Sequence, residues 1–214
     1  YTQCLDRLER WAGDIPISQI PRKSILEFHE TLYQQKPAFA NAIGRMISII
    51  FKFAYDKGII AANIARELKL PKQAPRQTIW TIDEQEAFLK AANQVGYQSM
   101  VLAVLLGIST AQREGDILSL TWHQYDGVAI RLRQRKTKRW VSVPALPELK
   151  SELDKAKVAN QAKAKEERCE YIVVCEGTKT KYRDDHFRHL FRKIANLAGL
   201  NHLQFRDLRR SAVV

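Results

Sequence analysis

The chain has 214 residues, of which 45% are apolar and 27% charged, so it is long enough to bury a core and its composition excludes a disordered protein. Its 35 Lys and Arg against 23 Asp and Glu give a formal charge of +12, which favours nucleic acid as a partner over an anionic membrane surface. Three cysteines without framework spacing indicate reduced thiols, and no signal peptide or apolar run of membrane-spanning length is present. We therefore expect a cytoplasmic protein with no membrane partner.

The first third of the chain reads as a helical region, and its clearest helix covers about residues 38–57. Apolar side chains recur there at helical spacing and predict a core face: Ile43, Ile47, Ile50, Phe51 and Ala54. A second stripe, also at steps of three and four, carries Asn41, Arg45, Ser48, Lys52 and Tyr55. Since Asn and Arg match base edges and Lys meets phosphate, this stripe is either a DNA-groove contact or a solvated helix face.

A linker follows the helical region. Gly58 is expected to end the long helix, and a short helix is expected to end near Leu70. The segment "LPKQAPRQ" then combines two prolines with two cations, Lys72 and Arg76, and Arg76 is placed to meet a phosphate backbone. We predict a helical domain at residues 1–72 and a second domain at residues 78–214.

The second domain is predicted to be mainly α with a small antiparallel β-sheet. Thr81 and Glu84 have capping-box spacing, and "MVLAVLLGI" is apolar all round, as expected for a buried central helix. "VAIRLRQ" and "RWVSVP" alternate as two strands of a hairpin, bent at "RKTK". We further expect a helix from Pro147 to about Arg168, a third short strand at "YIVVC", and a helix from Asp184 to Ala198 that Gly199 stops.

Three basic segments carry candidate chemistry. Arg113 follows the buried helix directly, so it needs an anion, either Glu114 or Asp116 in an ion pair or a phosphate held through two parallel bonds. Lys136 lies in the basic hairpin tip "RQRKTKRW", which is either simply solvated or places an ammonium against a phosphate ester. The candidate phosphate contacts beside it are Lys138 and Arg139.

The third segment is "FRDLRR", near the end of the chain. Arg206 and Arg209 are three residues apart and share one helix face, while Leu208 is placed to face the core. Taken alone, this pattern is also that of a helix with a basic exposed side.

Together the three segments resemble the tyrosine recombinases, the phage-integrase type of site-specific recombinase. The first box of that family, Thr-Gly-x-Arg-x-(Gly/Ser)-Glu-Leu and then Leu-x-Trp, resembles "TAQREGDI" at 110–117 and "LTW" at 120–122. Its Lys-Thr-Gly-Lys-like turn, followed by a strand that ends in Pro, resembles "KTKR" and "VSVP". Its second box, His-Asp-Leu-Arg-(His/Arg)-(Ser/Thr)-Ala, resembles "RDLRRSA" at 206–212. The likeness covers residues 78–214 well and the helical core-binding region more loosely.

The resemblance implies transesterification through a 3′-phosphotyrosyl intermediate, without a metal or other cofactor. Arg113 and Arg209 would hold the non-bridging oxygens of a DNA phosphate, and Lys136 would protonate the leaving 5′-oxygen. The implied partners are double-stranded DNA at attachment sites and, for the intact protein, a homotetramer on DNA in the nucleoid of a bacterial host. His186 and His189 sit one helical turn apart, and we expect an ordinary helical role for them rather than metal binding.

Three positions depart from the family pattern: Arg206 replaces His, Ala111 replaces Gly, and Asp116 replaces Glu. Arginine can bond a phosphate oxygen at position 206 but cannot shuttle protons near neutral pH. A recombinase-like protein that only occupies DNA, or a helical nucleic-acid-binding module with accidental motif matches, therefore remain as alternatives.

The nucleophilic tyrosine of the family follows the second box. Tyr125, Tyr171 and Tyr182 all precede Arg206, so none of them fits that role. We expect an incomplete catalytic domain that binds DNA without cleaving it.

Overall fold

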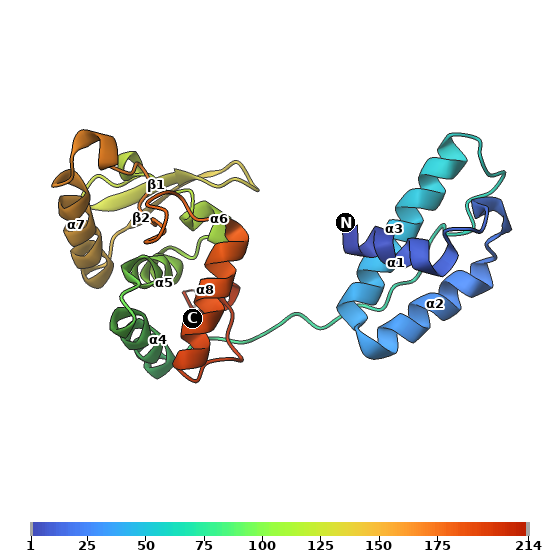
Figure 1. The fold of residues 1–214 in the computed structure, drawn as a ribbon, viewed down its shortest axis with the longest axis horizontal. Coiled ribbons are helices and arrows are strands. Elements are labelled where there is room, and N and C mark those ends of the chain that lie inside the picture. Colours follow the sequence, from blue (N-terminus) through green and yellow to red (C-terminus); the bar gives the residue numbers. More distant parts are fainter. Residues whose placement is uncertain (1, 213–214) are drawn as a thin grey trace. The chain divides into compact units, whose positions relative to one another are not determined.

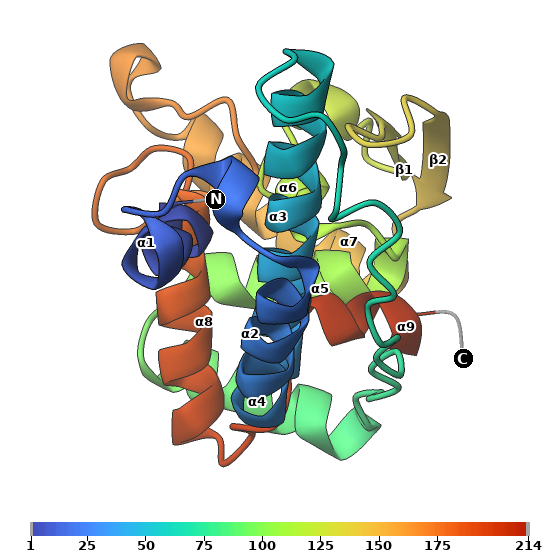
Figure 2. The same ribbon diagram turned by 90° about the vertical axis from the view of Figure 1, so that its right-hand side faces the viewer.

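The computed structural model describes residues 2–212 and contains two compact units, one ending at Arg76 and the other beginning at Gln77 (Figure 1). The first unit is helical. Its helix α1 crosses the pair formed by the two longer helices (Figures 1 and 2). Its elements are α1 (Thr2–Ala12), a 3₁₀ turn (Ile17–Gln19), α2 (Arg22–Gln35) and α3 (Pro37–Asp56).

The predicted long helix is confirmed as α3, which begins with a proline that its first turn accommodates. α3 packs against both α1 and α2. Of its predicted apolar face, Ile50 is only half-buried and lies outside the core. The other members lie in a core that also contains Ile25, Phe28 and Leu32: Ile43, Ile47, Phe51 and Ala54. Trp11 of α1 closes this core by stacking on Phe28, with 4.3 Å between the ring centroids.

The expected short helix that ends near Leu70 is wrong, because residues 57–80 form turns and irregular backbone. Gly58 adopts φ +70°, which terminates α3 as predicted. Beyond it, the Asn63 side chain accepts a hydrogen bond from the Ala65 amide, and the guanidinium of Arg22 donates to the carbonyls of Ile64 and Arg66. These side chains satisfy the backbone groups that a helix would otherwise pair.

The second unit is mostly helical and carries one two-stranded antiparallel sheet, which confirms the predicted fold class. Its helices are α4 (Ile82–Gln94), α5 (Gln98–Thr110), α6 (Glu114–Ile117), α7 (Pro147–Gln161), α8 (Asp184–Leu197) and α9 (Leu208–Ser211). The strands are β1 (Ala129–Arg133) and β2 (Trp140–Pro144), paired from Ala129 opposite Pro144 to Arg133 opposite Trp140. Three 3₁₀ turns complete it: Trp122–Gln124, Lys165–Glu167 and Phe205–Asp207.

α5 is the buried central helix that its apolar sequence predicts, and it packs against α4, α6, α7 and α9. The predicted capping box begins α4, since the Thr81 hydroxyl accepts from the Glu84 amide and the Glu84 carboxylate accepts from the Thr81 amide. Gly199 adopts φ +74° just after α8, as its predicted stop role requires. None of the described helices is long and apolar enough to cross a membrane.

Two predicted elements of this unit are wrong. "YIVVC" at 171–175 forms isolated bridges rather than a strand, with Tyr171 opposite Thr121 and Val174 opposite Lys181. Its apolar residues reflect burial in the core, where Ile172 is 2% exposed. α7 ends at Gln161 rather than near Arg168, because the Arg168 guanidinium folds back and donates to the carbonyls of Gln161 and Lys163.

The C-terminal segment is held tightly on α5. A side chain at Gly107 would place its Cβ only 3.0 Å from a Leu208 methyl carbon, so glycine permits the close approach of α9. The indole of Trp80 donates to the Gln204 carbonyl at 3.3 Å, and the Trp80 amide donates to the Ser211 hydroxyl at 2.8 Å. The segment containing Arg206 and Arg209 is thereby held by α5 and by Trp80.

Candidate functional site

Arg113 is placed by a sharp turn between α5 and α6. Ala111 ends α5 in the left-handed region at φ +53°, the conformation that glycine adopts most readily. Arg113 follows as the N-cap residue of α6. This turn places a partly buried arginine between the apolar helix α5 and the start of α6.

The structure brings Arg113, Arg206 and Arg209 to the wall of one cavity of about 560 Å³. The remaining wall is formed by Gln112, Glu114, Gly115, Phe187, Arg188, Phe191, Arg192, Gln204 and Phe205. Within residues 2–212, the buried Nη1 of Arg113 has no hydrogen-bond partner. A buried guanidinium nitrogen in this condition is costly unless an anion meets it.

The ion-pair alternative for Arg113 is not realised among the described residues. Glu114 instead accepts a hydrogen bond from the Arg188 guanidinium at 2.9 Å, and Asp116 Oδ1 accepts from the backbone amide of Arg135 at 2.9 Å. Burial raises the pKa of Glu114, and the neighbouring Arg188 opposes that rise. Glu114 therefore has another partner, whereas Asp116 uses only Oδ1, and its buried Oδ2 has no hydrogen-bond partner among the described residues. Neither carboxylate is hydrogen-bonded to Arg113 Nη1, so an external anion is the partner that this nitrogen lacks.

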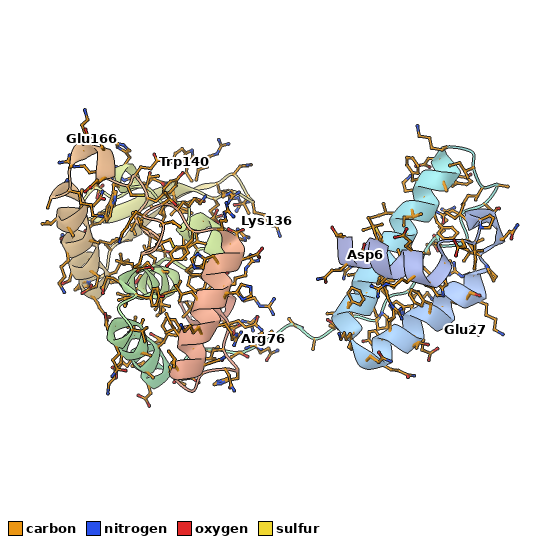
Figure 3. The ribbon with its side chains drawn as sticks, viewed as in Figure 1. Asp6, Glu27, Arg76, Lys136, Trp140 and Glu166 are labelled. Carbon is orange, nitrogen blue, oxygen red and sulfur yellow. The ribbon has the colours of Figure 1, made fainter. Side chains whose placement is uncertain are left out.

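Lys136 lies at the exposed tip of the hairpin, between β1 and β2 (Figure 3). It lines a second cavity of about 430 Å³ with Arg135 and Lys138, and this cavity shares Arg113 and Gly115 with the first. Neither of the two cavities is lined by all four predicted catalytic residues. Arg113 therefore lines both cavities. Arg206 and Arg209 line only the first, and Lys136 lines only the second.

The predicted stripe along α3 is only partly exposed. Asn41 is 5% exposed, and its side chain is bonded to His29 and to the Pro71 carbonyl, so its expected place on a DNA-facing surface is wrong. The chain that leaves the unit covers this end of α3. Arg45 and Lys52 are exposed, and Lys52 makes an ion pair with Asp56 at 2.7 Å. The other predicted DNA contacts are also exposed: Arg76, Lys138 and Arg139.

The three tyrosines considered from the sequence are poorly suited to attack a phosphate. Burial and a hydrogen bond to Asp154 raise the pKa of Tyr125 to about 12. Burial also raises the pKa of Tyr182, whose hydroxyl is bonded to Glu176 and Ser99. A hydrogen bond to Glu170 raises the pKa of Tyr171. Because the phenolate is the attacking species, each of these shifts disfavours nucleophilic attack.

Several cavity residues were missed from the sequence. Arg188 and Arg192 are four residues apart on α8, a spacing that places both on one helix face and offers a usable signal. Gln112 carries no comparable signal, since a single buried amide has no pattern of its own.

Elsewhere, Cys175 Sγ lies 3.7 Å from His186 Nδ1, and no third metal-ligating side chain joins them within the described ranges.

Comparison with known proteins places these features in a family context. A family model described as "Phage integrase family" matches residues 79–214. The integrase of Escherichia phage HK022 is 25% identical over 145 residues, which are 67% of this chain and 40% of the phage protein. The chain therefore spans about two-fifths of the length of this relative.

Two crystal structures of lambda integrase resemble the fold, each with a TM-score of 0.80 and 22% identity. One is a dimer of residues 75–356 bound to a COC′ core site; the likeness covers 99% of this chain and 79% of that one. The other is a tetramer bound to a Holliday junction, where 99% and 64% are covered. At this level of identity the likeness shows the fold.

Proposed function

The chain belongs to the phage integrase family, the tyrosine recombinases, and we propose that it binds duplex DNA and places a phosphodiester against Arg113, Arg206 and Arg209. The observation that carries this proposal is that Arg113, whose buried Nη1 has no hydrogen-bond partner among residues 2–212, lines a cavity that Arg206 and Arg209 also line. A phosphate presents several oxygens, so guanidiniums can bind it through parallel, charge-assisted hydrogen bonds.

In the intact protein, we propose that these residues support site-specific recombination by transesterification. Arg113 and Arg209 would stabilise the added negative charge of the transition state, and Arg206 would supply a further hydrogen bond to a phosphate oxygen. Lys136 would donate the proton to the leaving 5′-oxygen from the adjoining cavity. The transesterification needs no input of energy, because the phosphotyrosyl bond conserves that of the phosphodiester.

The DNA surface is proposed to extend to both units. In the first unit it uses Arg45 and Lys52 of α3 together with Arg76, and in the second unit it uses Lys138 and Arg139. Such contacts go to the phosphate backbone and set register and orientation, while base edges carry the sequence information. We leave Asn41 out of this surface because it is buried. Assembly as a homotetramer on attachment-site DNA, within the nucleoid, is proposed for the intact protein by analogy with the lambda integrase tetramer.

The first test is removal of the Arg113 side chain. We expect Arg113→Ala to weaken duplex binding by roughly 10- to 100-fold, because a hydrogen bond to a charged group contributes about 1.5–3 kcal/mol. Fluorescence anisotropy of a labelled duplex at fixed salt measures the change. The control is Lys165→Ala, which removes one positive charge from an exposed site in the 3₁₀ turn beyond the end of α7. Equal losses of affinity in both variants would show that Arg113 contributes no more than an ordinary surface cation, and would contradict the proposal.

A second test concerns cleavage. We propose that this chain alone does not cleave DNA, since no tyrosine of residues 2–212 lines either of the two cavities that hold the candidate catalytic residues. Incubation with a nicked duplex, followed by a denaturing gel, should show no covalent protein–DNA adduct. An adduct that disappears in Tyr171→Phe would identify a nucleophile inside the chain and overturn this part of the proposal.

The non-catalytic alternative, a family member that only occupies DNA, is favoured by one observation. Arg206 stands where the family pattern has histidine, and it cannot exchange a proton near neutral pH. Arg206→His distinguishes the two in a longer form of the protein that carries a nucleophilic tyrosine. A gain of recombination only in the variant supports the alternative, whereas recombination by the unaltered protein excludes it.

A further inference from the structure

A chain of hydrogen-bonded amides connects the hairpin tip to the segment that carries Arg113. The Thr137 hydroxyl donates to Gln134 Oε1 at 2.5 Å, and Gln134 Nε2 donates to Gln112 Oε1 at 2.7 Å. Gln112 Nε2 then donates to the Thr110 carbonyl at 2.8 Å, at the end of α5. We call the two glutamine side chains, Gln112 and Gln134, the amide relay.

The relay joins the immediate neighbours of two proposed phosphate-binding residues. Gln112 precedes Arg113, and Thr137 follows Lys136. On the other side of Lys136, the backbone amide of Arg135 donates to the buried Asp116 at 2.9 Å. The tip of an otherwise exposed hairpin is therefore held to the Arg113 segment on both sides of the lysine.

The chemistry of the carboxamide suits this position. Each relay amide accepts one hydrogen bond and donates another, which neither a carboxylate nor an ammonium group does. A carboxylate there would add a negative charge beside Lys136 and repel phosphate, and a cation would compete for it. Gln112 is 6% exposed, and its hydrogen bonds involve both the oxygen and the nitrogen of its amide, so this buried polar side chain is satisfied at both ends.

We propose that the amide relay is a positioning device that holds Lys136 over the cavity it shares with Arg113, so that both contact the same DNA phosphate. The inference rests on the proposed function, because it assumes that Lys136 meets a phosphate. The proposal makes two neutral residues, Gln112 and Gln134, responsible for the position of the proton donor Lys136.

The test uses the salt dependence of DNA binding by this chain, because the slope counts the phosphates that cations neutralise. Lys136→Met should lower the slope of log affinity against log salt by about 0.9. Gln134→Met removes no charge, yet we expect it to lower the slope in the same direction, because the displaced Lys136 no longer reaches its phosphate. Adding Gln134→Met to Lys136→Met should then change the slope no further.

Controls separate this effect from a general loss of structure. Gln98→Met is the matched control, since Gln98 donates to Glu152 at 2.8 Å in an exposed pair at the start of α5. It should keep the unaltered slope. Thr137→Val cuts only the exposed end of the relay and should give a smaller decrease than Gln134→Met, which keeps the test valid if Gln134→Met unfolds.

The outcomes are distinct. An unaltered slope in both Gln134→Met and Thr137→Val overturns the relay proposal, as does a double variant whose losses are additive. A flat salt response in the unaltered chain contradicts the proposed function itself, before any variant is compared. The relay is supported if the salt slope decreases in Gln134→Met and Thr137→Val and stays unaltered in Gln98→Met.

Discussion

We expect the affinity of this chain for duplex DNA to fall by about 10³-fold when salt rises from about 50 mM to about 200 mM. About six phosphate contacts suffice for a loss of this size. The proposed contacts from both units include nine cations: Arg45, Lys52, Arg76, Arg113, Lys136, Lys138, Arg139, Arg206 and Arg209. Each phosphate that a cation neutralises releases condensed counterions, and added salt opposes that release. A titration followed by anisotropy at four or five salt concentrations gives the slope.

Charge removal in the first unit tests whether both units contribute to this slope. Arg45→Ala together with Lys52→Ala should lower it by about 1.8, because two phosphate contacts are lost. An affinity that barely responds to salt contradicts phosphate-dominated binding by any of these cations. An unaltered slope in the double variant excludes α3 from the contact surface.

The largest expected change in stability comes from Phe205→Ala. The Phe205 ring is 5% exposed and packs edge-on against Phe187 and Phe191, with centroids 5.0 Å and 5.6 Å away. Removing a buried phenylalanine ring costs about 3–5 kcal/mol of unfolding free energy, because lost burial and a residual cavity add together. Hydrogen exchange of the α5 backbone amides measures this cost for the second unit by itself.

A matched surface substitution calibrates that measurement. Ile82 is 71% exposed in the same unit, and Ile82→Ala should change the unfolding free energy by no more than about 0.5 kcal/mol. A cost below about 1 kcal/mol for Phe205→Ala would contradict the aromatic packing. Since Phe205 directly precedes Arg206, DNA affinity should fall with stability in this variant and stay unaltered in Ile82→Ala.

The sequence predicts best the elements whose signals are local. The capping box of Thr81 and Glu84, the left-handed Gly199 and the hairpin pairing are confirmed, because each depends on residues a few positions apart. The helix expected near Leu70 and the extension of α7 to Arg168 are wrong. In both places an arginine side chain, Arg22 or Arg168, binds backbone carbonyls that propensity alone assigns to a helix.

The predicted third strand is wrong for a different physical reason. A short apolar run is compatible with a strand or with buried irregular backbone, and only the available partners decide between them. The Ile172 amide donates to the Leu120 carbonyl, and the Cys175 amide donates to the Thr180 carbonyl, so single bridges replace a ladder. Asn41 is a similar case, because it lies in α3 as its spacing predicts, but the chain at Pro71 covers it.

The sequence by itself determined the family, the mainly helical class and the identity of the basic residues, because these depend on residue type and on spacing along the chain. Only the tertiary structure decided that Arg113 shares a cavity with Arg206 and Arg209, that Glu114 pairs with Arg188, and that two glutamines connect the hairpin to the segment that carries Arg113. Such contacts join residues roughly 20 to 100 positions apart. The packing of α9 on Gly107 and the register of one hairpin set them, and neither leaves a periodic trace in the sequence.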